Sequence, residues 1–159
     1  MRSWVALALL CALATGPSAG AVAAGSWWLG ISVGGTQLVG TFVEYRLGEI
    51  GVVASLGTAV PWRLNDLSLA FQLRRYFGGA PPVPYLGLGG WAFLVQEGGE
   101  WGWLTSLDLT GGLQWGLGEK AGLELGAMLH YFLSAYWQGE ARFNFRFLIL
   151  PFLALKWAP

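Results

Sequence analysis

The residue with the most evident chemical capacity is His130, the only histidine in the chain. An imidazole can act as a general base near neutral pH, and Ser134 and Glu140 follow it in the order of a serine triad. A triad needs the base within hydrogen-bond reach of the nucleophile and an acid that orients the base. Ser134 lies four residues from His130, past the end of the strand that the local pattern predicts, so strand geometry does not join them. We expect no catalytic residue, and a structural His130 bonded to Asn144 or to the acid partner of an arginine.

The last 19 residues, 141–159, point to a different chemistry, that of buried charge. Polar residues alternate there with phenylalanines: Arg142, Asn144 and Arg146 with Phe143, Phe145 and Phe147. A period of two places successive side chains on opposite faces of a strand. We therefore expect the phenylalanines to face lipid and the polar side chains to point into a barrel. A buried ion without a counter-charge costs several kcal/mol, so acids on other strands must accompany the arginines.

The expected interior network is structural and forms two layers that each mix acid and arginine. Strand direction, counted from an N-terminus on the periplasmic side, assigns each residue to the outer or the inner half of the barrel. The outer layer contains Asp108, Arg142 and Arg146, with Asn144 and His130 roughly opposite each other on neighbouring strands. The inner layer contains Glu44, Arg46, Arg74 and Glu124. A proton relay, a gate or an active site would use the same residue types. A plug that keeps the interior rigid and dry is the interpretation we adopt, because any small barrel must fill its interior.

The composition excludes several classes of protein. The chain is 55% hydrophobic and 11% charged, with 25 glycines, which is too apolar for an ordinary water-soluble domain. Net charge is zero without a basic patch, so we expect no nucleic-acid partner. One histidine and dispersed carboxylates offer no metal-ligand cluster, and no glycine-rich loop links a strand to a helix as a phosphate site would require. We expect no metal and no cofactor.

The first 24 residues have the pattern of a cleavable signal peptide. Arg2 precedes an apolar run from Trp4 to Ala14, and small residues follow up to a cleavage site near Ala23 or Ala24. The run is about half the roughly 20 residues that a spanning helix needs. Cys11, the only cysteine, lies inside it, so the mature chain would contain no thiol chemistry. We divide the chain into a signal peptide, 1–24, and a barrel, 25–159.

Hydrophobic residues recur with a period of two along almost all of the chain after residue 24. Seven turn signals divide it: 34–35, 48–49, 61–66, 78–84, 97–102, 118–120 and 134–140. The eight resulting segments are near the 9 to 11 residues with which a tilted strand crosses a bilayer. An even number of antiparallel strands can close without an unpaired edge. The sequence predicts an all-β, eight-stranded antiparallel up-and-down transmembrane barrel. Its interior is too narrow for a general porin.

Aromatic and small residues complete the pattern. We expect an interfacial aromatic belt, or else a recognition surface, at Trp62, Trp101, Trp103, Tyr136, Trp137 and Trp157. Small residues on inward positions either leave voids for a ligand or make room for large neighbours: Gly30, Ser32, Gly34, Gly40, Ser55, Gly57, Ala70, Gly112 and Gly126 beside Phe42, Tyr76, Trp91 and Phe132. The sequence does not weigh these volumes against each other.

Three features resemble a known family: the signal peptide, the stretch PYLGLGG at 84–90 that opens the fifth strand, and a last strand that alternates down to Trp157. Together they resemble the small eight-stranded outer-membrane barrels typified by OmpX and the barrel part of OmpA. The resemblance implies an outer-membrane location, contact with outer-membrane lipids, and insertion by the outer-membrane assembly machinery, which reads a terminal aromatic strand. The family usually finishes on the aromatic itself, whereas Ala158 and Pro159 follow Trp157 here.

The expected function is a structural, envelope-stabilising or surface-interaction barrel that is not an enzyme. Two alternatives stay open: a small lipid- or ligand-binding barrel, and an enzyme that modifies lipid A or phospholipid. One deacylase group of similar barrels carries a histidine, a serine and an acid near the outer rim of its last strands. That group has its serine two residues after the histidine, where this chain has Phe132.

Overall fold

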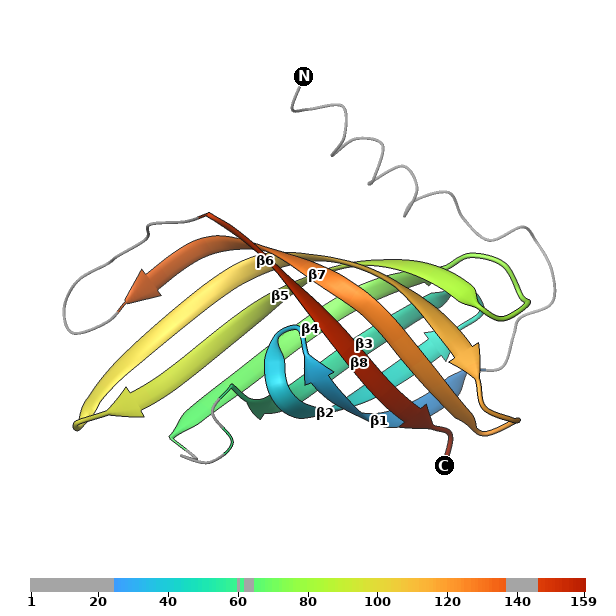
Figure 1. Ribbon diagram of the computed structural model, residues 1–159, viewed down its shortest axis with the longest axis horizontal. Helices are drawn as coiled ribbons and strands as arrows, with labels where there is room; N and C mark the ends of the chain where they lie inside the picture. Colours follow the sequence, from blue (N-terminus) through green and yellow to red (C-terminus); the bar gives the residue numbers. More distant parts are fainter. Residues whose placement is uncertain (1–24, 60, 62–64, 137–145) are drawn as a thin grey trace, which may run out of the picture.

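A computed structural model describes residues 25–59, 61, 65–136 and 146–159, which form a single closed barrel (Figure 1). Every strand pairs antiparallel with its sequence neighbours, and β1 pairs with β8 to close the sheet. The strands are β1 (Ser26–Gly34), β2 (Gln37–Leu47), β3 (Ile50–Thr58), β4 (Asp66–Tyr76), β5 (Val83–Glu97), β6 (Glu100–Gly116), β7 (Ala121–Tyr136) and β8 (Phe147–Trp157). The predicted eight-stranded antiparallel barrel is confirmed. No helix in the described ranges has the length and hydropathy to cross a membrane.

The two faces of each strand follow the predicted period of two. On β4 the outward side chains are between 39% and 57% exposed: Leu67, Leu69, Phe71 and Leu73. The side chains between them are buried: Ser68, Ala70, Gln72 and Arg74. Large apolar residues thus cover the outside of the wall, while polar residues lie inside it, which is the reverse of a water-soluble barrel.

Inward glycines make room for large interior side chains. A Cβ atom on Gly112 would lie 2.8 Å from the ring of Tyr85, and one on Gly126 would lie 2.7 Å from the ring of Phe152. Such distances are too short for a real contact, so each aromatic ring occupies the volume that its glycine leaves free. The small inward residues at these positions are matched to bulky neighbours.

The strands differ greatly in length, and the difference falls at one end of the barrel. We call the end where β1 starts and β8 finishes the inner end, and the opposite end the outer end. β1 and β3 contain nine residues each, whereas β5, β6 and β7 contain 15, 17 and 16. The turn between β1 and β2, where Gly34 and Gly35 adopt positive φ values of 86° and 68°, stops well short of the outer end that β5–β7 reach (Figure 1).

Candidate functional site

Four fully or almost fully buried charges lie together in the inner half of the barrel. Lys156 on β8 places Nζ 2.7 Å from Oε2 of Glu44 on β2 and 2.6 Å from Oε1 of Glu124 on β7. Arg74 on β4 places Nη1 2.9 Å from Oε2 of Glu124. None of the four residues is more than 4% exposed. Two acids and two bases therefore balance in charge, and they connect four strands across the interior.

Polar side chains satisfy the remaining atoms of this inner ion cluster, which we define as Glu44, Arg74, Glu124 and Lys156. The hydroxyl of Tyr76 donates to Oε1 of Glu44, and that of Tyr85 donates to Oε2 of Glu124 at 3.2 Å. Gln114 accepts a bond from Lys156 at 3.1 Å, and Gln72 accepts one from Nε of Arg74 at 3.1 Å. Buried charges are tolerated when both counter-charges and hydrogen bonds are supplied, and this cluster has both.

A second polar group, the histidine cluster of Ser106, Asp108 and His130, lies nearer the outer end. Asp108 and His130 are direct cross-strand partners on β6 and β7. Nδ1 of His130 lies 2.7 Å from Oδ1 of Asp108, and the hydroxyl of Ser106 donates to the same oxygen at 2.5 Å. The ring of Trp91 packs on His130 with centroids 5.1 Å apart, and its Nε1 donates to Ser68 at 2.7 Å.

The histidine cluster contains the residue types of a triad in a geometry that does not support one. In a serine triad the nucleophile and the orienting acid contact opposite nitrogens of the imidazole. Here Ser106 and Asp108 both lie on the Nδ1 side of His130, at 3.5 and 2.7 Å, and Nε2 has no partner in the described part of the chain. Ser134 shares a hydrogen bond with Thr105 at 2.7 Å. Glu140 lies outside the described residues.

Eight of the nine predicted network residues fall into three groups. Glu44, Arg74, Asp108, Glu124 and His130 are buried inside the barrel. Arg46 is half-buried near the inner end, where its guanidinium lies 3.8 Å from the ring centre of Tyr76. Arg142 and Asn144 lie outside the described residues.

Two predictions about the outer layer are wrong. Arg146 is exposed, because β8 begins only at Phe147 and Arg146 precedes the last residue pair with β7. His130 lies opposite Leu148 on β8 instead of opposite Asn144, because the pairing of β7 with β8 starts at Tyr131↔Phe147, which gives a register four residues away from the expected one. Within the described residues, the outer layer therefore contains the Asp108–His130 pair in place of an acid–arginine pair.

Lys156, the cation that joins both acids of the inner ion cluster, is absent from the predicted network. The sequence feature that could have placed Lys156 inside is its position in the alternation of β8. It shares the inward face of this strand with Phe152 and Ala154, which are both buried. The flanking residues Leu155 and Trp157 face outward, and the apolar run of this strand obscured the single charge. The interior acceptors Gln72 and Gln114 are also absent from the predicted network, because that network was built from charged residues and neither glutamine carries a charge.

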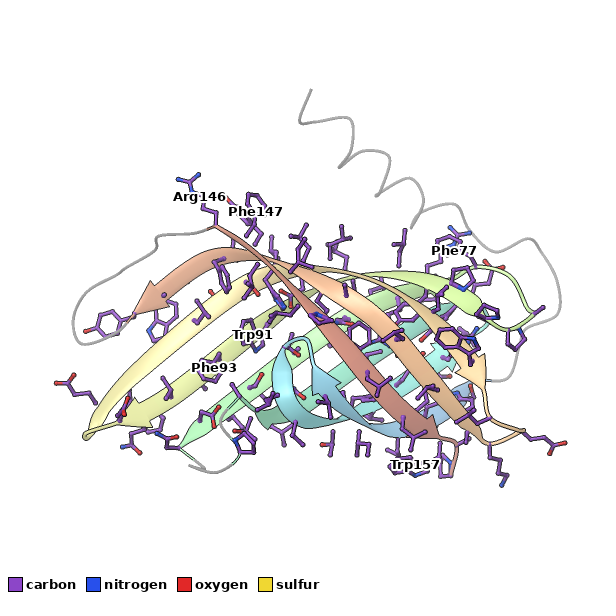
Figure 2. All side chains as sticks on the ribbon, in the orientation of Figure 1. Phe77, Trp91, Phe93, Arg146, Phe147 and Trp157 are labelled. Carbon is purple, nitrogen blue, oxygen red and sulfur yellow. The ribbon has the colours of Figure 1, made fainter. Side chains whose placement is uncertain are left out.

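Those aromatic residues of the expected belt that the structure describes face away from the barrel interior. Trp101, Trp103, Tyr136 and Trp157 are all 40% to 60% exposed. Trp103 and Tyr136 stack at the outer end, with ring centroids 6.4 Å apart and planes 14° apart, whereas Trp157 lies at the inner end (Figure 2). Trp62 and Trp137 lie outside the described residues.

A small cavity lies inside the barrel beside the inner ion cluster. It has a volume of about 20 Å³ and is bordered by Gln72, Arg74, Met128 and Phe152 among others. That volume accommodates about one water molecule and no larger ligand. In the described ranges no group of three or more His, Cys, Asp or Glu side chains converges in a way that could hold a metal ion.

Comparison with known proteins finds similarity at the level of fold. No protein-family model and no curated protein matches the chain. Among solved structures, the crystal structure of Neisserial surface protein A, an eight-stranded outer-membrane barrel, is similar with a TM-score of 0.50 and 14% sequence identity. The match covers 84% of this chain and 94% of that protein. Both the closed barrel and the resemblance to small outer-membrane barrels are thereby supported, and the chain has the fold of an eight-stranded outer-membrane barrel.

Proposed function

We propose that this chain is an integral barrel of the outer membrane whose interior is plugged by its own side chains. The observation that carries the proposal is the reversed polarity of the wall. Outward positions of all eight strands carry exposed large apolar residues, among them Trp27, Tyr45, Leu56, Phe71, Leu88, Leu107, Leu125 and Ile149. Such an outer surface is stable in hydrocarbon and would aggregate in water.

The plug is supported by the two interior clusters and by the small volume of the cavity beside Arg74. The inner ion cluster spans the barrel from β2 to β8 through direct contacts of 2.6 to 2.9 Å. Trp91, His130 and Phe132 fill the section above it, each no more than 9% exposed. An aqueous channel needs a wider barrel of about 16 strands. The role we propose is therefore structural or envelope-stabilising, or an interaction at the surface, instead of diffusion of solutes.

Three observations support the proposed outer-membrane location: the apolar outer wall of the barrel, the similarity of fold, and the signal-peptide pattern of residues 1–24. The expected partners are outer-membrane lipids and the machinery that assembles barrels into that membrane. We also propose that the chain is not an enzyme. Both polar neighbours of His130 lie at one ring nitrogen, and the histidine is fully buried, so His130 does not present a base to a substrate.

The proposal is tested by refolding residues 25–159 in detergent and in phospholipid vesicles. The unboiled chain should migrate faster than the boiled chain on a gel, because a closed barrel stays compact. Vesicles that contain it should show no steady ion conductance. An unshifted band would refute the closed barrel, and a steady conductance would refute the plug. Altered lipid composition in cells that express the wild type, abolished by His130→Ala, would refute the non-enzymatic role.

A further inference from the structure

The barrel wall is notched above the β1–β2 turn. β1 pairs with β8 only from Leu29↔Trp157 to Gly34↔Phe152, whereas β8 continues to Phe147 in contact with β7. Within the described residues, the outer part of β8 therefore has no strand neighbour on the side that faces β1. Pro151 stands where the pairing stops and accepts a bond from the N–H of Gly35 at 2.9 Å. Proline has no N–H of its own to leave unpaired at such an edge.

An apolar pocket of about 370 Å³ occupies this notch. Its lining contains no charged residue and includes Gly35, Thr36, Leu38, Trp91, Leu150 and Pro151. The indole N–H of Trp91 and the carbonyl of Thr36 are both engaged by Ser68, which receives a bond from Trp91 and donates to Thr36, both at 2.7 Å. Figure 2 shows Trp91 inside the barrel near the β1–β2 turn, so the pocket runs from the outer wall to an interior aromatic ring.

The notch lies at a depth that hydrocarbon reaches. Exposed large apolar residues run from Trp101 to Leu117 along and just beyond β6, but only from Leu38 to Leu47 on β2. At about 3.3 Å per residue and a strand tilt of about 45°, these bands are about 37 and about 21 Å tall. The apolar band of outer-membrane barrels is about 25 Å tall. The β2 side alone is too short for that layer, so bilayer hydrocarbon meets the notch.

We propose that the notch binds one acyl chain of a surrounding lipid, which inserts between β8 and the β1–β2 turn and ends against Trp91. Its surroundings are continuous with the lipid-facing wall, since Phe147 and Ile149 beside it are 62% and 66% exposed, the highest values among the large apolar residues. The uncharged lining suits a hydrocarbon chain and offers nothing to a headgroup. This inference rests on the proposed membrane insertion and adds a lateral lipid site to it.

The test uses nuclear Overhauser contacts between lipid methylenes and the perdeuterated, amide-protonated chain in phosphatidylcholine nanodiscs. Contacts to the indole N–H of Trp91 and the amide of Thr36 are expected. Leu150→Trp, which fills the notch, should abolish the contacts to Trp91. The matched control Leu153→Trp, on the outer wall of the same strand and 48% exposed, should retain them.

The outcomes separate the lipid site from membrane insertion. Amides on the outer wall, such as that of Leu109, should contact lipid methylenes in every variant. If they do while Trp91 and Thr36 show water contacts only, the notch is wet and the acyl-chain site is overturned, while insertion stands. If no wall amide contacts lipid, membrane insertion itself is overturned, and the lipid site with it.

Discussion

Removal of the Lys156 charge should destabilise the barrel more than any other single substitution in its interior. Lys156→Met retains much of the side-chain volume but leaves Glu44 and Glu124 with Arg74 as the single cation of the inner ion cluster, which changes its net charge from zero to −1. Lys156 contacts both carboxylates at 2.7 and 2.6 Å and is fully buried. Breaking a buried ion pair from one side costs about 3–5 kcal/mol, and we expect a loss in that range.

The measurement is urea unfolding of the refolded chain in detergent micelles, followed by the fraction of the fast-migrating gel band. Lys120→Met is the matched control, because Lys120 is exposed in the β6–β7 turn, and its effect should stay within about 0.5 kcal/mol. Glu44→Gln combined with Lys156→Met restores neutrality and should recover at least about 1 kcal/mol, as expected for residues in one network. A loss below about 1 kcal/mol for Lys156→Met alone would mean that water screens the cluster, and would refute the dry interior.

Three further predictions concern other parts of the wall and interior. Gly126→Ala should lower unfolding stability by about 1–3 kcal/mol through overpacking, because its Cβ would lie 2.4 Å from a backbone oxygen, whereas Gly111→Ala, whose nearest neighbour is 3.6 Å away, should change little in the same urea titration. Asp108→Ala should lower the free energy of unfolding by about 1–3 kcal/mol, because it leaves buried polar groups without their acceptor. Asp108→Asn retains an acceptor oxygen and should lower it by less. Equal losses in the two variants would contradict the role of this hydrogen bond. A double-mutant cycle of Trp103→Ala and Tyr136→Ala should give a coupling of about 0.5–1.5 kcal/mol for the stacked pair, and additive effects would show that the stacking contributes nothing.

The strand pattern was readable from sequence because each strand has one apolar and one mixed face. Periodicity alone assigned Phe71 to the outside and Phe42 and Trp91 to the inside, as the structure has them. It also predicted that Glu44 and Arg74 both point into the barrel. The face of a side chain depends only on its position in the alternation along its own strand, and not on which residue lies opposite it.

Register and strand length were not readable, because they depend on turn geometry and on pairing between distant segments. The partner of His130 differs from the predicted one because the pairing of β7 with β8 starts only at Tyr131↔Phe147. Arg146 was placed inside by parity, although pairing with β7 stops at Phe147. The notch above the β1–β2 turn follows from the same unequal strand lengths, so no local pattern could indicate it.

The inner ion cluster also bears on how the barrel reaches its closed state. Glu44 and Lys156 are 112 residues apart in sequence, and Arg74 and Glu124 are 50 apart. These contacts have long loop-closure distances, which slow folding. Glu124 meets Lys156 when β8 pairs with β7, but Glu44 on β2 acquires Lys156 only when β8 joins β1. A sheet still open between β8 and β1 would hold Glu44 without this cation in an apolar medium, where isolated charge is costly. The cluster therefore favours all-or-none closure, because each open intermediate has an electrostatic penalty that the last strand removes.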